Sequence, residues 1–344
     1  MRLYNIPIES LEERYSAQWN KIFPEKFKEL GIEYITIYPE PATNKINKGK
    51  FLDIVGTNHF KANQLSKICE LFMEDKVKDG DVFFFHDLWF PGLEMLFYMR
   101  DALKINIKIG GMLHAGTYDP FDFLTQCGMA KWGNRLEQSW LNGVDFVFVA
   151  TEYHKNLFLN KRDIYYEFGS KIFVTGFPHP FNISLTPEDI SKKENIVVFP
   201  HRMDPEKNPE MFREISKEFE GTDWKFIFSK EVCKNKNEYY DLLKKSKIAL
   251  SFADQETWGI AQQEAMFSCC IPLVPNRLSY KEMYNVNYQY IDLYDCKYKL
   301  YKSMVTYDNE IKSAEYYSNI SRLATSSLQS IPKMMNIIKN LKEN

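Results

Sequence analysis

Residues 196–210 read IVVFPHRMDPEKNPE and combine an apolar strand, a charged loop and the start of a helix. The apolar run ends at Pro200, the loop contains Arg202 and Lys207, and the helix is expected to begin near Pro209. In a doubly wound sheet, ligands bind beyond the carboxyl ends of the strands. Two cations beside a helix N-terminus therefore predict a diphosphate site, where Arg202 forms paired hydrogen bonds and Lys207 acts as a point charge.

A second segment, residues 252–266 with the sequence FADQETWGIAQQEAM, repeats this order of strand end, loop and helix. The loop is expected to turn at Gly259, which leaves Glu256 in the loop and Glu264 in the first turns of the helix. A carboxylate in that helical position can accept hydrogen bonds from a ribose diol. We therefore expect Glu256 to face the ligand cleft and Glu264 to suit a ribose.

Short apolar runs alternate with amphipathic segments along most of the chain. Most of the runs are continuous in Val, Ile and Phe, which is typical of strands buried on both faces of a parallel sheet. Such alternation predicts βαβ units and an α/β fold. The expected strands are Leu3–Ile6, Tyr34–Tyr38, Val82–His86, Ile105–His114, Phe146–Ala150, Ile172–Thr175, Ile196–Pro200, Lys225–Ser229, Ile248–Phe252 and Ile271–Val274.

The length of 344 residues suggests two domains. The best candidate for a hinge is the segment GFPHP at residues 176–180, because two prolines and a glycine interrupt regular structure. We therefore expect an N-terminal domain over residues 1–178 and a C-terminal domain over residues 179–325. The remaining residues, 326–344, are expected to form a helix that packs back on the N-terminal domain.

Composition excludes several classes of protein. Forty-six acidic and 44 basic side chains give a formal charge of −2, which argues against binding nucleic acid through bulk charge but leaves a local basic patch open. The six cysteines form no CxxC pair, so neither a zinc site nor a disulfide framework is expected. No apolar run approaches ~18 residues, and no signal segment is apparent. These features predict a cytoplasmic protein with no membrane partner and no metal.

The paired motifs resemble the C-terminal nucleotide-sugar domain of retaining GT-B glycosyltransferases of family 4. That family has an Arg and a Lys in a GR-x-x-x-x-K loop, followed by E-x7-E. This chain has Arg202 and Lys207, followed by Glu256-x7-Glu264. The resemblance covers residues ~195–285 well and the two-domain plan more loosely, and His201 stands where the family has glycine.

The resemblance implies a GT-B fold, in which two doubly wound Rossmann-like domains face a central cleft. It implies that the C-terminal domain binds a nucleotide-sugar donor, a UDP-sugar, and that the N-terminal domain binds the acceptor. The activity implied is transfer of a hexose or pentose to an acceptor hydroxyl with retained configuration. Such enzymes need no metal and no cofactor, because the Arg202 and Lys207 pair stabilises the leaving group.

The site residues follow from the same resemblance. Glu256 would contact the donor sugar beside the reacting carbon, and Glu264 would hold the ribose. His114 matches the N-domain histidine that touches the donor sugar, so the implied catalytic residues are His114, Arg202, Lys207 and Glu256. The implied donor-binding residues are Arg202, Lys207, Glu256, Thr257, Gly259, Ile260 and Glu264.

The N-terminal half is also similar to glycosyltransferases of T4-like bacteriophages, some of which modify hydroxymethylated pyrimidines in DNA. The similar segments are PIESLEERYSAQW at 7–19, GDVFFF at 80–85 and LHAGTYD at 113–119. This resemblance favours 5-hydroxymethylpyrimidine in double-stranded phage DNA as the acceptor. The residues expected to contact it are Lys45, Lys48, Lys50, Trp89 and Tyr118.

Other functions and simpler roles stay open. The HRxxxxKNPE form at residues 201–210 is similar to glycosyltransferases that act on a modified tRNA base, so tRNA is the alternative acceptor, followed by a glycan. A nucleotide-sugar epimerase or binding protein is the alternative from another class. The two cations and two glutamates could be surface charges, His114 a core histidine, and the aromatic residues core packing. For Asp87, after a strand, a helix cap is favoured over a catalytic base.

Overall fold

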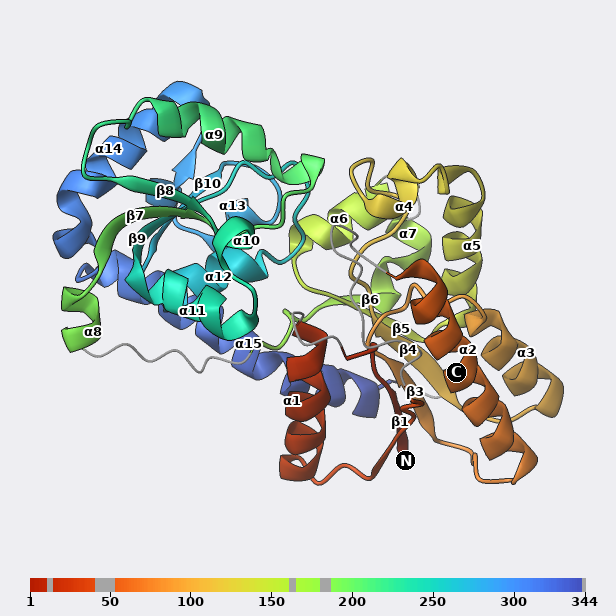
Figure 1. Ribbon diagram of the computed structural model, residues 1–344. Coiled ribbons are helices and arrows are strands. Elements are labelled where there is room, and N and C mark those ends of the chain that lie inside the picture. The colour runs from red at the N-terminus through yellow and green to blue at the C-terminus, as the bar shows by residue number, and fades with distance from the viewer. Residues whose placement is uncertain (11–14, 41–52, 161–164, 180–186, 342–344) are drawn as a thin grey trace. The chain divides into compact units, whose positions relative to one another are not determined.

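The computed structural model describes residues 1–10, 15–40, 53–160, 165–179 and 187–341 (Figure 1). Lys45, Lys48 and Lys50 lie outside the described residues. The chain divides into two compact units. The first contains residues 1–150, 155–178 and 329–344, and the second contains residues 151–154 and 179–328.

The first unit is built on a six-stranded parallel sheet with the order β2-β1-β3-β4-β5-β6. The winding direction reverses between β1 and β3, as in a Rossmann sheet. The strands are β1 (Leu3–Ile6), β2 (Tyr34–Thr36), β3 (Val82–Phe85), β4 (Lys108–Met112), β5 (Phe146–Val149) and β6 (Ile172–Val174). The helices along this part of the chain are α1 (Tyr15–Glu29), α2 (Ile54–Met73), α3 (Leu93–Leu103), α4 (Phe123–Gln126), α5 (Ala130–Gly143), α6 (Glu152–Asn160) and α7 (Tyr165–Phe168).

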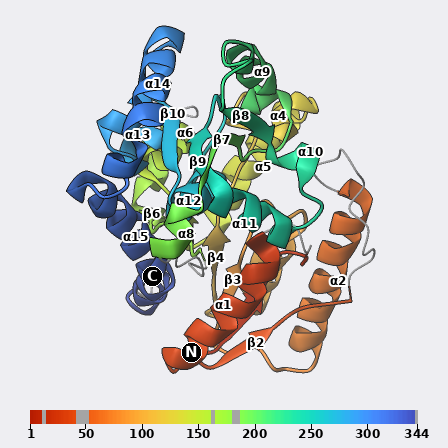
Figure 2. The same cartoon turned by 60° about the vertical axis from the view of Figure 1, so that its left-hand side comes forward.

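The second unit is built on a five-stranded parallel sheet with the order β11-β10-β9-β7-β8, so its winding reverses between β7 and β9. Helices α9 and α14 cover one face of this sheet, and α11 and α12 cover the other (Figures 1 and 2). The strands are β7 (Glu194–Phe199), β8 (Lys225–Phe228), β9 (Ser246–Leu250), β10 (Ile271–Pro275) and β11 (Gln289–Tyr290). The helices along this part of the chain are α8 (Pro187–Ser191), α9 (Pro209–Lys217), α10 (Ser229–Val232), α11 (Lys236–Lys245), α12 (Ile260–Phe267), α13 (Tyr280–Met283), α14 (Leu293–Glu310) and α15 (Ala314–Lys339), of which α15 continues into the first unit from residue 329.

The central strands form the cores of both units. All four residues of β3 are buried, as are all five of β10 and the last four of β7. Burial on both faces explains why these strands appear in the sequence as continuous apolar runs. The expected α/β architecture with two parallel sheets is confirmed. The final helix, α15, begins at Ala314 instead of near residue 326.

Strand β4 passes so close to its neighbours that two of its residues must be glycine. A Cβ atom at Gly111 would lie 2.0 Å from the Phe85 carbonyl oxygen, and one at Gly110 would lie 2.2 Å from the Phe146 carbonyl oxygen. No side chain fits at such distances without a shift of the backbone. The pair Gly110–Gly111 therefore allows β3, β4 and β5 to pair in one sheet.

Candidate functional site

The predicted loops follow β7 and β9, which are neighbours in the second sheet. Hydrogen bonds of Asn208 and Asp254 join the loops. Asn208 Nδ2 donates to the Phe252 carbonyl oxygen at 3.0 Å and to Asp254 Oδ2 at 2.6 Å, and the Asp254 N–H donates to the Glu206 carbonyl oxygen at 2.8 Å. The loops thus meet at the carboxyl edge of the sheet where its winding reverses, the position at which such sheets bind ligands.

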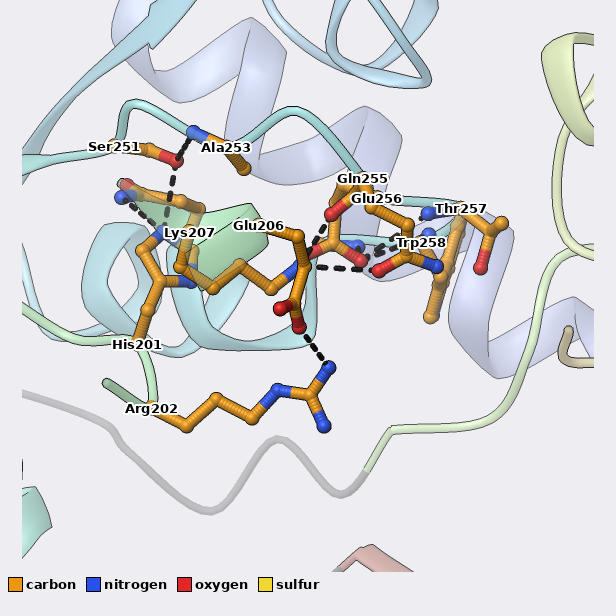
Figure 3. Close-up of polar contacts among 12 residues, drawn as sticks. His201, Arg202, Glu206, Lys207, Ser251, Ala253, Gln255, Glu256, Thr257 and Trp258 are labelled. Carbon is orange, nitrogen blue, oxygen red and sulfur yellow. Dashed lines mark hydrogen bonds and ion pairs between the residues drawn. The ribbon is translucent and has the colours of Figure 1, made fainter. Parts of the chain in front are cut away.

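Lys207 connects the two loops at their centre (Figure 3). Its side chain is 6% exposed, and its ammonium group donates to the Gln255 carbonyl oxygen and lies 3.5 Å from Glu256 Oε2. Lys207 and Glu256, 49 positions apart in the sequence, form an ion pair. The structure therefore brings together one predicted cation and one predicted carboxylate.

Glu256 is held by the backbone that leads into α12. Its Oε1 accepts hydrogen bonds from the N–H groups of Thr257 at 3.2 Å, Trp258 at 3.4 Å and Gly259 at 2.9 Å. Gly259 has φ +57°, which turns the chain into α12 at Ile260. Burial alone would raise the pKa of the Glu256 carboxyl, but Lys207 and these N–H groups outweigh burial and lower it. The carboxylate is therefore ionised at neutral pH.

His201 occupies the position where the resembled family has glycine. It is buried, and its Nε2 lies 2.8 Å from Ser251 Oγ (Figure 3). Ser251 Oγ in turn lies 3.1 Å from the Tyr280 hydroxyl. Burial, reinforced by the charge of Lys207, lowers the pKa of His201 to about 3. The imidazole is therefore neutral at neutral pH and links the ends of β7 and β9.

Arg202 lies apart from the Lys207–Glu256 pair. Its side chain is 31% exposed, its Nη2 donates to Glu206, and its Nε lies 3.1 Å from Asp204 Oδ2. Both partners belong to its own loop. The guanidinium is therefore placed at the edge of the site, where it can exchange these carboxylates for the oxygens of a ligand.

Glu264 lies in α12, and its side chain is 2% exposed. Its Oε1 accepts hydrogen bonds from Lys236 Nζ at 2.5 Å and from the Tyr240 hydroxyl at 2.9 Å. His179 Nε2 lies 3.4 Å from the same oxygen. None of these three partners was predicted from the sequence, although the spacing of Lys236 and Tyr240 places both on one face of α11.

His114, predicted to touch the donor sugar, is fixed within the first unit. Its Nε2 donates to the His86 carbonyl oxygen at 2.7 Å, so Nδ1 is the acceptor and lies 3.3 Å from the Tyr15 hydroxyl. Burial lowers the pKa of His114, which keeps the ring neutral.

The aromatic residues predicted to contact the acceptor are also packed in the first unit. Trp89 is half-buried, and its Nε1 donates to Glu137 Oε1 at 2.8 Å. Tyr118 is 4% exposed and packs edge-on against Phe158 at 4.9 Å between ring centroids. In this structure Tyr118 is a core residue and does not present its ring to a base.

The preferred interpretation of Asp87 as a helix cap is wrong. Its Oδ1 accepts from the Trp89 N–H at 3.1 Å, and its Oδ2 lies 3.2 Å from Lys61 Nζ. Helix α3 is instead preceded by Gly92. Lys61 lies on α2 and also donates to the Trp89 carbonyl oxygen at 2.6 Å. Asp87 and Lys61 therefore belong to one local network.

Within the described ranges, no three or more His, Cys, Asp or Glu side chains are grouped so that they could hold a metal ion. The described helices also include none with the length and apolar character needed to cross a membrane.

No protein-family model matches the chain. The tRNA-queuosine alpha-mannosyltransferase of Drosophila melanogaster is 33% identical over 125 residues, which cover 29% of this chain and 33% of that protein. The match therefore spans about a third of this curated relative.

Solved structures match over more of the chain. Sucrose-phosphate synthase from Thermosynechococcus elongatus has a TM-score of 0.67 at 12% identity, covering 99% of both chains. A variant of TarM from S. aureus, in complex with fondaparinux, alpha-GlcNAc-glycerol and UDP, has a TM-score of 0.55 at 17% identity. That match covers 80% of this chain and 58% of TarM. With its two parallel sheets, the chain has the GT-B fold of glycosyltransferases.

Proposed function

We propose that the protein transfers a sugar from a nucleotide-diphosphate sugar to an acceptor hydroxyl. The observation that carries this proposal is the Lys207–Glu256 ion pair, formed by loops after two neighbouring strands where the winding of the second sheet reverses. A buried cation beside the start of α12 suits a pyrophosphate. The GT-B fold and the partial match to a mannosyltransferase support the same activity.

The chemistry follows from this arrangement. The bond between the anomeric carbon and the phosphate oxygen breaks, and its electron pair stays on the departing diphosphate. Lys207, together with Arg202, stabilises the charge that develops there. The acceptor hydroxyl attacks from the side that the diphosphate leaves, and its proton passes to a phosphate oxygen. The configuration is then retained, and Glu256 holds the donor sugar beside the reacting carbon.

The finer features of the donor reaction belong to the same proposal. We assign UDP as the nucleotide, because the similar TarM structure contains UDP. Since Lys207 and Arg202 supply the positive charge, turnover is expected to be unchanged when EDTA removes divalent metals. We place the reaction in the cytoplasm, where reduced thiols such as the six free cysteines persist.

For the acceptor, we propose a modified nucleoside in tRNA. Two observations support it: the partial identity to a tRNA-queuosine mannosyltransferase and the HRMDPEKNPE sequence at residues 201–210. The second candidate is 5-hydroxymethylpyrimidine in double-stranded DNA, which the resemblance of residues 113–119 to phage enzymes favours. In that case Trp89 and the lysines Lys45, Lys48 and Lys50 remain the proposed contacts.

One panel experiment tests the function. The protein is incubated with UDP-, GDP- and ADP-sugars and with tRNA, hydroxymethylated DNA or unmodified DNA, and the products are digested to nucleosides for mass spectrometry. We expect one hexose or pentose to be added to a tRNA nucleoside, with slow donor hydrolysis when no acceptor is present. Transfer to hydroxymethylated DNA alone would replace the acceptor. Epimerisation of the free donor, or binding with no turnover, would contradict the transferase assignment.

A further inference from the structure

Helix α11 supplies a lysine and a tyrosine to the Glu264 carboxylate. Lys236 and Tyr240 lie one helical turn apart, and both donate to Oε1, at 2.5 and 2.9 Å. His179 Nε2 adds a third contact to this oxygen at 3.4 Å. One oxygen of the carboxylate therefore carries three contacts from two separate segments of the chain.

The other oxygen of Glu264 is left available. Across the described residues, the hydrogen bonds to this carboxylate all end on Oε1, and Oε2 accepts none. The buried Tyr239 hydroxyl nearby forms no hydrogen bond of good geometry within the described residues. An ionised oxygen with unused lone pairs is an acceptor for hydroxyl groups.

The position of Lys236 is itself fixed. Its ammonium group lies 4.6 Å from the ring centroid of Tyr239 and 4.8 Å from that of Tyr240, so cation–π attraction adds to the ion pair. Its side chain is 25% exposed, whereas that of Glu264 is 2% exposed. The partly exposed lysine therefore balances the charge of a buried carboxylate.

This lysine also controls the charge of Glu264. Burial alone would raise the pKa of the carboxyl, but Lys236 and His179 outweigh burial and bring it to about 2. A buried carboxylate that loses its partner is strongly destabilised as an ion. Without Lys236, the carboxyl would be protonated more readily and would lose the shortest of the contacts that fix Oε1.

We propose that Lys236 and Tyr240 are positioning residues that fix Oε1 of Glu264 and so reserve Oε2 for the ribose diol of the donor. The inference rests on the proposed function, because it takes a nucleoside diphosphate as the ligand of the second unit. It assigns α11 a role in selecting ribonucleotides over deoxyribonucleotides.

Calorimetric titration with UDP and 2′-deoxy-UDP tests this role, with GDP or ADP pairs used if the panel experiment identifies another nucleotide. We expect Lys236→Met to weaken binding of the ribonucleotide about tenfold and to leave the deoxyribonucleotide nearly unchanged. In steady-state assays, the KM for the donor should rise by the same factor while kcat changes less than about threefold. Lys236→Arg, which keeps the charge, should restore most of the preference for ribose.

Matched variants separate positioning from simple loss of packing. Lys245→Met removes an exposed lysine from the same helix and should leave both affinities unchanged. Tyr240→Phe removes one hydroxyl and should reduce the preference for ribose about threefold. Glu264→Gln should abolish the preference, and adding Lys236→Met to it should cause no further loss, since both act on one contact.

The outcomes are distinguishable. If the wild type binds no nucleoside diphosphate, the proposed function fails. If the wild type binds and Lys236→Met either leaves binding unchanged or weakens both nucleotides equally, only the positioning role fails. If Lys236→Met does not fold, the preference of Tyr240→Phe for the ribonucleotide tests the positioning role instead. A preference equal to that of the wild type would overturn the inference.

Discussion

Lys207 is almost completely buried and contacts both loops of the site. The charge of its ammonium group is balanced by Glu256 and by the carbonyl oxygen of Gln255. Because these contacts are fixed before a ligand arrives, the proposed reaction would need little reorganisation when charge develops on the diphosphate. In the proposed mechanism, Lys207 therefore acts through its charge and not only through its bulk.

Replacing that charge at constant size should abolish most of the activity. We expect Lys207→Met and Glu256→Gln each to lower kcat at least about 100-fold, because a preorganised contact to the developing charge is lost. The single-turnover rate with the donor from the panel experiment measures this effect. Lys245→Met serves as the control, and circular dichroism verifies folding. Rates near those of the wild type in either variant would remove the residue from the mechanism.

Buried neutral histidines make the protein sensitive to acid. Burial lowers the pKa of His86 and of His201 to about 3, whereas an unfolded chain titrates near 6.5. Between these pH values the unfolded state binds more protons than the folded state. The free energy of unfolding is therefore greatest above pH 6.5 and decreases as the pH drops toward 3. In this range, each histidine lowers the free energy of unfolding by about 1.4 kcal/mol for each pH unit.

Urea unfolding at several pH values measures this dependence. His201→Gln removes one of the two groups and should flatten the dependence between pH 6.5 and 5 for the unit that contains it. A His201→Gln variant with the slope of the wild type would show that His201 is protonated in the folded protein.

At the level of helices and strands, the strands could be predicted from the sequence because local patterns determine them. Each of the ten expected strands has a counterpart in the two sheets, because continuous apolar runs are typical of buried parallel strands. Strand β11 was missed, since its two residues form no apolar run. The convergence of Lys207 and Glu256 could be predicted from the sequence because neighbouring strands bring their loops together.

The remaining features depend on tertiary contacts that no local pattern contains. Lys236 meets Glu264 across 28 positions of the sequence, and this contact exists only once α11 packs beside α12. Asp87 was misassigned because the preference of aspartate for helix caps is shared by the tight turn that it forms with Trp89.

Strand β4 offers a test at this scale. Gly111→Ala would place a methyl group 2.0 Å from the Phe85 carbonyl oxygen, so β3 and β4 would have to separate. We expect a loss of about 1–3 kcal/mol in the unfolding free energy, as found for overpacked cores. Urea denaturation followed by tryptophan fluorescence measures it. Unchanged stability would mean that β4 does not pair with β3 in the described register.

For the whole molecule, the chain does not divide once into two consecutive units. Residues 329–344 group with the first unit, although residues 179–328 belong to the second. Ile331, Met334, Met335 and Ile338 are each at most 4% exposed. Lys333 Nζ also donates to the carbonyl oxygen of Val174, in the last strand of the first sheet, at 2.6 Å. The first unit is thus completed by the end of the chain.

Deleting residues 329–344 should therefore destabilise the first unit. Four buried apolar side chains are removed, and burial of each contributes about 1.5–3 kcal/mol. We expect a lower urea midpoint for the truncated chain and increased hydrogen exchange in the β6 amides. Replacing Lys333 alone by Met should cost far less. A truncated chain with the midpoint of the wild type would contradict this division of the chain.

A crystal structure of the protein grown with the nucleoside diphosphate that it binds tests the proposed donor site most directly. We expect the diphosphate between Lys207 and Arg202 at the carboxyl ends of β7 and β9, with the ribose hydroxyl groups on Glu264 Oε2. A diphosphate bound at the first sheet, or contacting neither Lys207 nor Glu264, would rule out this donor site.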